Sequence, residues 1–231
     1  MTLPLVLLPG MMCDARLFAP QIAAFSGKRA VLLAPIVARD TIEGLAADVL
    51  AVAPPRFALA GLSMGGIVAM EMLRQAPERV ERIALLDTNP LAETGAAKAR
   101  RGPQIAAVRA GRLAEIMRDE MKPNYLAEGP QRGATLDLCM EMALDLGPEV
   151  FVRQSEALMT RRDQSGALGK ARLPALALCG RADTLCPVAR HELIAGLIPG
   201  AQLEIIEGAG HLPTLEQPEP TNAALTRWLE A

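Results

Sequence analysis

Residues 57–66, Phe57-Ala58-Leu59-Ala60-Gly61-Leu62-Ser63-Met64-Gly65-Gly66, join an apolar run to the pattern G-x-S-x-G, and an amphipathic stretch begins at Ile67. Strand, sharp turn and helix in this order form a nucleophile elbow, which lifts the serine hydroxyl clear of the sheet. Side chains two residues either side of Ser63 would clash in so tight a turn, and Gly61 and Gly65 leave that space free. The bare pattern can arise by chance, but the strand and helix around it make the match specific. Ser63 is therefore the candidate nucleophile.

Short runs rich in Leu, Val and Ile recur on both sides of the elbow. They occupy residues 3–8, 30–34, 57–62, 82–86, 175–179 and 203–206. Runs without polar alternation are typical of strands buried on both faces of a parallel sheet. Helical patterns lie between them at residues 41–53, 64–75, 188–197 and 220–229. The alternation predicts an α/β fold with a doubly wound, mostly parallel sheet of about six strands.

One interval, residues 91–171, has no credible strand and is rich in Ala, Arg, Glu, Leu and Met. Gly and Pro residues divide it into four or five predicted helices, namely at Gly102-Pro103, Gly111, Pro123, Gly129-Pro130 and Gly147-Pro148. An insertion of this size at a strand end often carries function. We therefore expect a core formed by residues 1–90 and 172–231 and a helical cap or lid formed by residues 91–171. Arg100-Arg101 and Arg161-Arg162 in the cap can meet an acidic substrate group, although a solvated helix face is the simpler role.

A serine nucleophile needs a histidine base, and the chain has two histidines. His211 lies in the glycine-rich turn Gly208-Ala209-Gly210-His211, directly after the last predicted strand. Catalytic groups gather in loops at the carboxyl edge of such a sheet. His191 lies in a helical pattern flanked by charged residues, which predicts a solvated surface position. His211 is therefore the candidate base.

The base in turn needs an orienting carboxylate. Asp183 follows the predicted strand at residues 175–179, and the chain order Ser63, Asp183, His211 is the order of α/β-hydrolases. Asp87 is a competitor, because it ends the strand that follows the elbow helix. Its alternative role is a cap or turn residue in Asp87-Thr88-Asn89-Pro90. Chain order and loop context favour Asp183.

Two backbone N–H groups are expected to form an oxyanion hole. Met64 follows the nucleophile at a helix start, where its N–H has no partner in the helix. The second N–H is expected from Met11, in the loop after the first strand, where Gly10 allows a tight turn. Pro9 has no N–H to donate. A plain turn between strand and helix is the alternative for this loop.

Composition excludes several other functions. A net charge of −2 and six aromatic residues argue against nucleic acid as a partner. The start of the chain has no basic residue before its apolar run, and the longest uncharged run, between Arg56 and Glu71, is too short to cross a membrane. The four cysteines show neither a C-x-x-C pair nor metal-ligand spacing with the histidines. We expect reduced thiols in a cytoplasmic protein with no metal and no cofactor.

Taken together, the loop 7–11, the elbow, Gly180-Arg181-Ala182-Asp183 and Gly208-Ala209-Gly210-His211 resemble the α/β-hydrolase superfamily in its serine esterase-like branch. The resemblance covers nearly the whole chain. It implies a parallel-rich sheet, a lid and a Ser63–His211–Asp183 triad. Two departures stand out: Pro9-Gly10 replaces the His-Gly common in the family's oxyanion loop, and we expect a sheet that starts near Leu3 without the family's two leading antiparallel strands.

The elbow serine excludes the branches that carry aspartate there, such as haloalkane dehalogenases. The sequence therefore predicts a serine hydrolase of carboxylic esters with small or medium acyl groups, acting through an acyl-enzyme on a small-molecule substrate. A carbon–carbon bond hydrolase or thioesterase of the same fold is an alternative, and so is a non-catalytic ligand-binding homologue.

Overall fold

A computed structural model describes residues 2–231. It contains one six-stranded sheet with the order β2-β1-β3-β4-β5-β6, and every neighbouring pair is parallel. The strands are β1 (Leu5–Leu8), β2 (Val31–Leu33), β3 (Phe57–Leu62), β4 (Val80–Leu86), β5 (Ala175–Gly180) and β6 (Gln202–Ile206). The prediction of a mostly parallel sheet of about six strands is confirmed.

The strand order positions the site. The chain passes from β1 to the sheet edge at β2 and then returns to β3 on the other side of β1. Loops that follow β1 and β3 therefore leave the sheet in opposite directions, which opens a crevice at their carboxyl ends. Leu8 at the end of β1 pairs with Gly61 in β3, so the loop after β1 lies beside the elbow.

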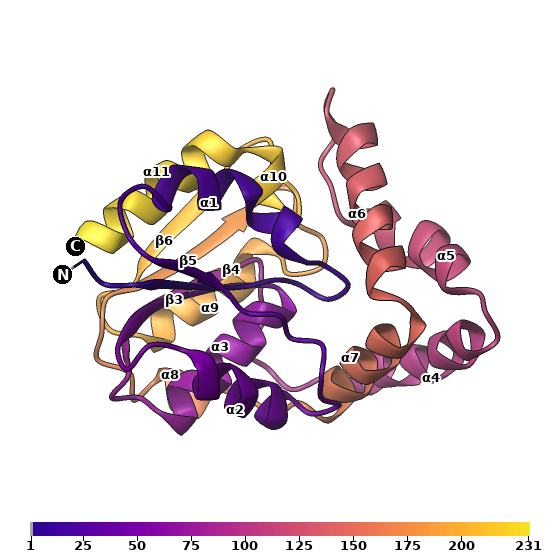
Figure 1. The fold of residues 1–231 in the computed structure, drawn as a ribbon, viewed down its shortest axis with the longest axis horizontal. Coiled ribbons are helices and arrows are strands. Elements are labelled where there is room, and N and C mark those ends of the chain that lie inside the picture. The colour runs from indigo at the N-terminus through magenta and orange to yellow at the C-terminus, as the bar shows by residue number, and fades with distance from the viewer. Residues whose placement is uncertain (1) are drawn as a thin grey trace.

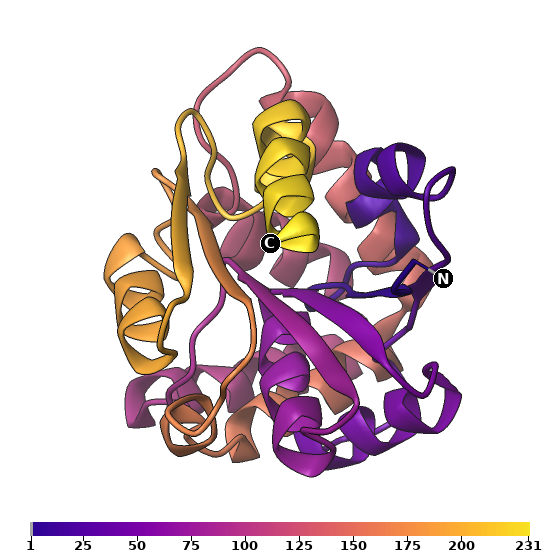
Figure 2. The same ribbon diagram turned by 90° about the vertical axis from the view of Figure 1, so that its left-hand side faces the viewer.

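Helices cover both faces of the sheet (Figures 1 and 2). One face carries α1 and α11, and the other carries α2, α3, α8 and α9. Their bounds are α1 (Ala19–Phe25), α2 (Ile42–Val52), α3 (Met64–Gln75), α8 (Ser165–Leu168), α9 (Val188–Leu197), the short α10 (Pro213–Glu216) and α11 (Pro218–Glu230), with a 3-10 turn η1 at Ala15–Phe18. Thr41 caps α2, because its Oγ1 accepts a hydrogen bond from the Gly44 N–H at 3.2 Å.

Between β4 and β5 the chain forms helices and no strand. They are α4 (Gly95–Arg109), α5 (Leu113–Ile116), the π-helical turn η2 (Met117–Met121), the 3-10 turn η3 (Lys122–Asn124), α6 (Arg132–Leu146) and α7 (Pro148–Thr160), followed by α8. The helices α4 to α7 lie together beside the end of the sheet at which β5 points (Figure 1). We call residues 91–171 the cap interval.

One predicted break in the cap interval is wrong. Gly102-Pro103 lies inside α4, which continues to Arg109. The helix persists because its later residues Ile105 and Val108 are buried against neighbouring elements, and this packing outweighs the hydrogen bond that Pro103 cannot donate. Another predicted boundary, at Gly147-Pro148, is present: Gly147 has φ +80°, which glycine adopts readily, and Pro148 begins α7.

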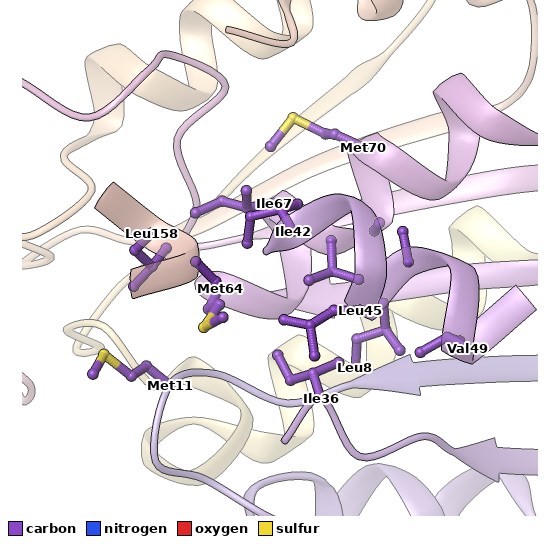
Figure 3. Packing of buried hydrophobic residues seen from close by; sticks show 14 of the residues in the cluster. Leu8, Met11, Ile36, Ile42, Leu45, Val49, Met64, Ile67, Met70 and Leu158 are labelled. Carbon is purple, nitrogen blue, oxygen red and sulfur yellow. The ribbon is translucent and has the colours of Figure 1, made fainter. Parts of the chain in front are cut away.

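Buried apolar side chains form one cluster on each face of the sheet. The larger cluster joins α2 and α3 to the cap interval: Leu158 of α7 packs with Met64 and Ile67 of α3 (Figure 3). The cap interval therefore shares its apolar packing with the sheet domain. Within residues 2–231 no helix is both long and apolar enough to cross a membrane, and all four cysteines are free thiols.

Candidate active site

Ser63 lies in the sharp turn between β3 and α3. Its backbone has φ 54° and ψ −115°, a conformation that costs energy for a residue with a side chain. A Cβ on Gly61 would lie 2.3 Å from the Gly65 carbonyl oxygen, and a Cβ on Gly65 would lie 2.1 Å from the Leu8 carbonyl oxygen. Both glycines are therefore required by backbone contact, as the G-x-S-x-G pattern predicts.

Ser63, His211 and Asp183 form a continuous chain of hydrogen bonds. His211 Nε2 lies 2.9 Å from Ser63 Oγ, and His211 Nδ1 lies 2.8 Å from Asp183 Oδ2. The three residues come from loops after β3, β6 and β5. This geometry lets the imidazole take a proton from the serine while the carboxylate fixes its orientation.

Asp183 is held as a carboxylate. Its other oxygen, Oδ1, accepts backbone N–H bonds from Leu185 at 2.8 Å and Cys186 at 3.0 Å. Burial acts to raise the pKa of Asp183, but His211 and these two amides outweigh burial and hold the pKa below its usual value. The Asp183 carboxylate is therefore ionised when His211 becomes protonated.

Asp87, the competing acid, lies in a different environment. Its Oδ1 accepts the Gly180 N–H at 2.9 Å, and its Oδ2 is buried and has no hydrogen-bond partner within residues 2–231. Burial and then the charge of Asp183 raise the pKa of Asp87 well above its usual value. Asp87 therefore favours the protonated form, which can donate a hydrogen bond to Asp183 and support it.

The predicted surface position of His191 is wrong, because the side chain is fully buried. His191 shares the inner face of α9 with Ile194 and Ile198, at helical spacings of three and four residues. Its Nε2 accepts the Thr88 N–H at 3.0 Å, and the Thr88 hydroxyl donates to the Ser63 carbonyl oxygen at 2.7 Å. Burial lowers the pKa of His191 to about 4. His191 is thus a neutral support for the elbow.

The loop after β1 faces the elbow. Gly10, Met11, Ser63 and Met64 line the same cavity. Met64 is the first residue of α3, and within residues 2–231 neither its N–H nor that of Met11 has an acceptor. These are the two amides that the sequence predicts for an oxyanion hole.

Gln154, in the cap interval, shapes that loop and has no signature in the local sequence. Its Oε1 accepts the Met12 N–H at 2.9 Å, and its Nε2 donates to the Ile36 carbonyl at 3.0 Å. Met12 has φ 55°. The non-glycine residues with positive φ in the described part of the chain are Met12, Ser63 and Asp87, which follow β1, β3 and β4. Backbone strain is thus concentrated at the carboxyl edge of the sheet, around Ser63.

Glu216 holds the loop that carries His211. One or both of its carboxylate oxygens accept backbone N–H bonds from Gly210, Leu212 and Ala127 at 2.8–3.0 Å. The His211 N–H itself donates to the Tyr125 carbonyl at 2.6 Å. Since Ala127 and Tyr125 belong to the cap interval, the position of the base depends on contacts from both parts of the chain.

A cavity of about 470 Å³ opens above Ser63. Its wall includes Met121 and Leu158 of the cap interval, whereas Met117 is buried in the larger apolar cluster outside that wall. Arg100, Arg101 and Arg161 also line it. Arg162 instead pairs with Glu43, with Nε 2.8 Å from Oε1.

Asp183, Cys186 and His211 are the one group in the described chain whose donor atoms converge as metal ligands would, within 4.8 Å. Two of the three already bond to each other, through Nδ1 and Oδ2. Burial, followed by the charges of Asp183 and Asp87, raises the pKa of the Cys186 thiol well above its usual value and so disfavours the thiolate that a metal binds. These residues fit a hydrogen-bonded triad better than a metal site.

A parallel sheet with a strained serine after β3, a carboxylate after β5 and a histidine after β6 is the architecture of α/β hydrolases. A family model described as the alpha/beta hydrolase family matches residues 5–224. The chain belongs to the alpha/beta hydrolase family.

Proteins similar to this chain include esterases and an enol-lactonase. The pimeloyl-[acyl-carrier protein] methyl ester esterase of Aromatoleum aromaticum is 28% identical over 78% of this chain and 76% of that protein. A thermophilic esterase from Thermogutta terrifontis, solved with malate bound, is 28% identical with a TM-score of 0.89, over 100% of this chain and 90% of that one. The enol-lactonase from Burkholderia xenovorans LB400 has a TM-score of 0.90 at 22% identity, over 100% and 92%, which shows a shared fold. The family evidence supports ester hydrolysis as the general activity.

Proposed function

We propose that the protein is a serine hydrolase that cleaves carboxylic esters of small or medium acyl groups through an acyl-enzyme. The observation that carries the proposal is the hydrogen-bonded chain from Ser63 Oγ through His211 to Asp183, at the floor of a cavity of about 470 Å³. The esterase relatives support the same reaction class. A ligand-binding homologue without activity has no need of this alignment.

In the first half-reaction, Ser63 Oγ attacks the ester carbonyl carbon while His211 Nε2 takes the serine proton. The tetrahedral oxyanion accepts hydrogen bonds from the N–H groups of Met11 and Met64. Collapse breaks the bond to the alcohol, which leaves with the proton from His211. Water then attacks the acyl-serine with His211 again as base, and Ser63 is released. Asp183 stabilises the imidazolium in both halves.

The test is a panel of nitrophenyl esters with acyl chains of increasing length, together with matched thioesters and a neutral amide. We expect the purified protein to hydrolyse the esters with a burst of nitrophenol when deacylation is slow, because an acyl-enzyme accumulates. A thioester hydrolysed with much higher kcat/KM than its matched ester would move the assignment to a thioesterase. Absence of turnover across the panel, with the protein folded, would contradict the proposal.

The same panel tests whether the cap interval selects the acyl chain. Met121 lines the cavity, whereas Met140 packs against the larger apolar cluster away from its wall. Met121→Ala should shift the preference toward longer or bulkier acyl groups, because it enlarges the cavity, and should leave the labelling rate of a small fluorophosphonate nearly unchanged. Met140→Ala is the matched control and should keep the preference of the unmodified protein.

An unchanged chain preference in an active Met121→Ala protein would show that the cap interval does not bound the acyl site. Met117→Ala is a poorer probe, because Met117 is buried and its truncation should cost about 2–5 kcal/mol of unfolding free energy.

A further inference from the structure

The cavity above Ser63 has an excess of positive charge in its wall. Its charged lining residues are four arginines and two glutamates: Arg100, Arg101, Arg161, Arg190, Glu93 and Glu120. An ester hydrolase that acts on neutral apolar substrates has no use for guanidinium groups at this place. The burial of Arg101 and Arg161 also has a cost, which a bound anion would offset.

Two of the arginines share one carboxylate. Arg101 Nη2 lies 2.9 Å from Glu93 Oε2, and Arg161 Nη1 lies 3.7 Å from the same oxygen. The three side chains are only 15%, 9% and 8% exposed for Arg101, Arg161 and Glu93. A single carboxylate cannot neutralise both cations. At 3.7 Å, Arg161 Nη1 is beyond hydrogen-bond distance from Glu93, so its donors are not saturated there.

The Arg161 side chain is held in place through its Nε atom. Its Nε donates to the Leu91 carbonyl at 3.1 Å, which fixes the guanidinium in the cavity wall, and within residues 2–231 its two terminal nitrogens donate no hydrogen bond. Burial lowers the pKa of Arg161, Glu93 and then Cys186 act against this, and the nearby charges of Arg101 and Arg190 lower the pKa further. Like charges therefore crowd this part of the wall.

Arg190 lies outside the cap interval and contributes the remaining arginine of the wall. It lies in the first turn of α9, close after Cys186 and Pro187, which also line the cavity. In the described chain Arg190 forms no ion pair, whereas Arg101 and Arg161 both pair with Glu93. Because the half-buried guanidinium of Arg190 has no carboxylate partner within residues 2–231, it is available to bind a carboxylate of the substrate.

We propose that Arg161 and Arg190 form a subsite for a carboxylate of the substrate, so that the preferred substrates are half-esters of dicarboxylic acids. This proposal rests on the proposed ester hydrolysis at Ser63. The ester carbonyl lies at Ser63 while the free carboxylate binds the guanidinium groups, whose planar forks match its two oxygens. Both groups line one cavity, so a single small molecule can reach both.

The experiment compares monomethyl adipate with methyl hexanoate, which have acyl chains of equal length and differ by the terminal carboxylate. Monomethyl succinate and monomethyl suberate test the spacing. We expect the best of the three half-esters to be hydrolysed with a higher kcat/KM than methyl hexanoate. Arg190→Gln should lower the ratio of the two kcat/KM values by about 10- to 100-fold, mainly through the KM of the half-ester. Arg161→Gln should do the same, and Arg161→Lys should retain part of the preference.

Arg162→Gln is the matched control, since Arg162 pairs with Glu43 outside the cavity wall, and its ratio should equal that of the unmodified protein. Arg190→Gln keeps the test decisive if removal of the buried Arg161 prevents folding. If methyl hexanoate is hydrolysed, but no half-ester is preferred and Arg190→Gln leaves the ratio unchanged, the carboxylate subsite is wrong and the ester hydrolase stands. If no ester is hydrolysed and a fluorophosphonate does not label Ser63, both proposals fail.

Discussion

Ser63→Ala should reduce ester turnover by about 10⁶-fold, because loss of a serine nucleophile removes the covalent route and leaves only binding and the oxyanion donors. The variant should also lose all labelling by a fluorophosphonate. The fold should survive, since the contacts that hold the elbow are made by the Ser63 backbone: its N–H donates to Leu86 at 2.9 Å, and its carbonyl accepts the Thr88 hydroxyl.

Ser26→Ala provides the control, because Ser26 is exposed just after α1 and is not part of the cavity wall. It should be labelled at the rate of the unmodified protein. Labelling that persists in Ser63→Ala, located by mass spectrometry on another residue, would show that the nucleophile is not Ser63.

Asp183→Asn should slow acylation by about 10⁴-fold, because asparagine cannot stabilise the imidazolium and presents His211 in the wrong tautomer. Asp87→Asn should have a much smaller effect. Asparagine resembles the protonated acid that the site favours, and it keeps an oxygen for the Gly180 N–H and a donor for Asp183. Pre-steady-state measurement of the nitrophenol burst in both variants gives the acylation rates.

The two carboxyls make a matched pair, since each is buried and lies in a loop after a neighbouring strand. The reverse order of effects, with Asp87→Asn the slower enzyme, would assign the acid to the loop after β4. Equal and large losses would mean that the pair acts as one unit, with a proton shared between the two groups.

Most of the sheet and the candidate triad could be predicted because their signals are local. A strand buried on both faces is an uninterrupted apolar run, as in β3, and a turn with φ 54° at Ser63 requires glycine at fixed positions around it. His211 was recognisable from its place after the last strand. Asp183 was distinguished from Asp87 by chain order, and the structure adds a reason in the amides that bind Asp183.

The supporting residues could not be predicted, since their partners are distant in sequence. Gln154 accepts a hydrogen bond from Met12, which is 142 positions away in the sequence, and Glu216 accepts one from Ala127, which is 89 positions away. His191 is different. The spacing of residues 191, 194 and 198 marks one face of α9, and this pattern was available in the sequence, but the adjacent charged residues obscured it.

The bonds of Gln154 have a consequence for attempts to engineer this protein. A chimera that receives α4 to α7 from a relative also loses contacts outside the cap interval, because Gln154 lies in α7 and forms hydrogen bonds with the backbone of Met12 and Ile36. If the transferred segment has no glutamine at position 154, the Met12 N–H loses its acceptor, and the neighbouring turn at Met11 loses the support of that hydrogen bond. In this chain an exchange of α4 to α7 therefore also alters the support of the loop beside Ser63, and successful grafts should carry residue 154 and the loop 10–12 together.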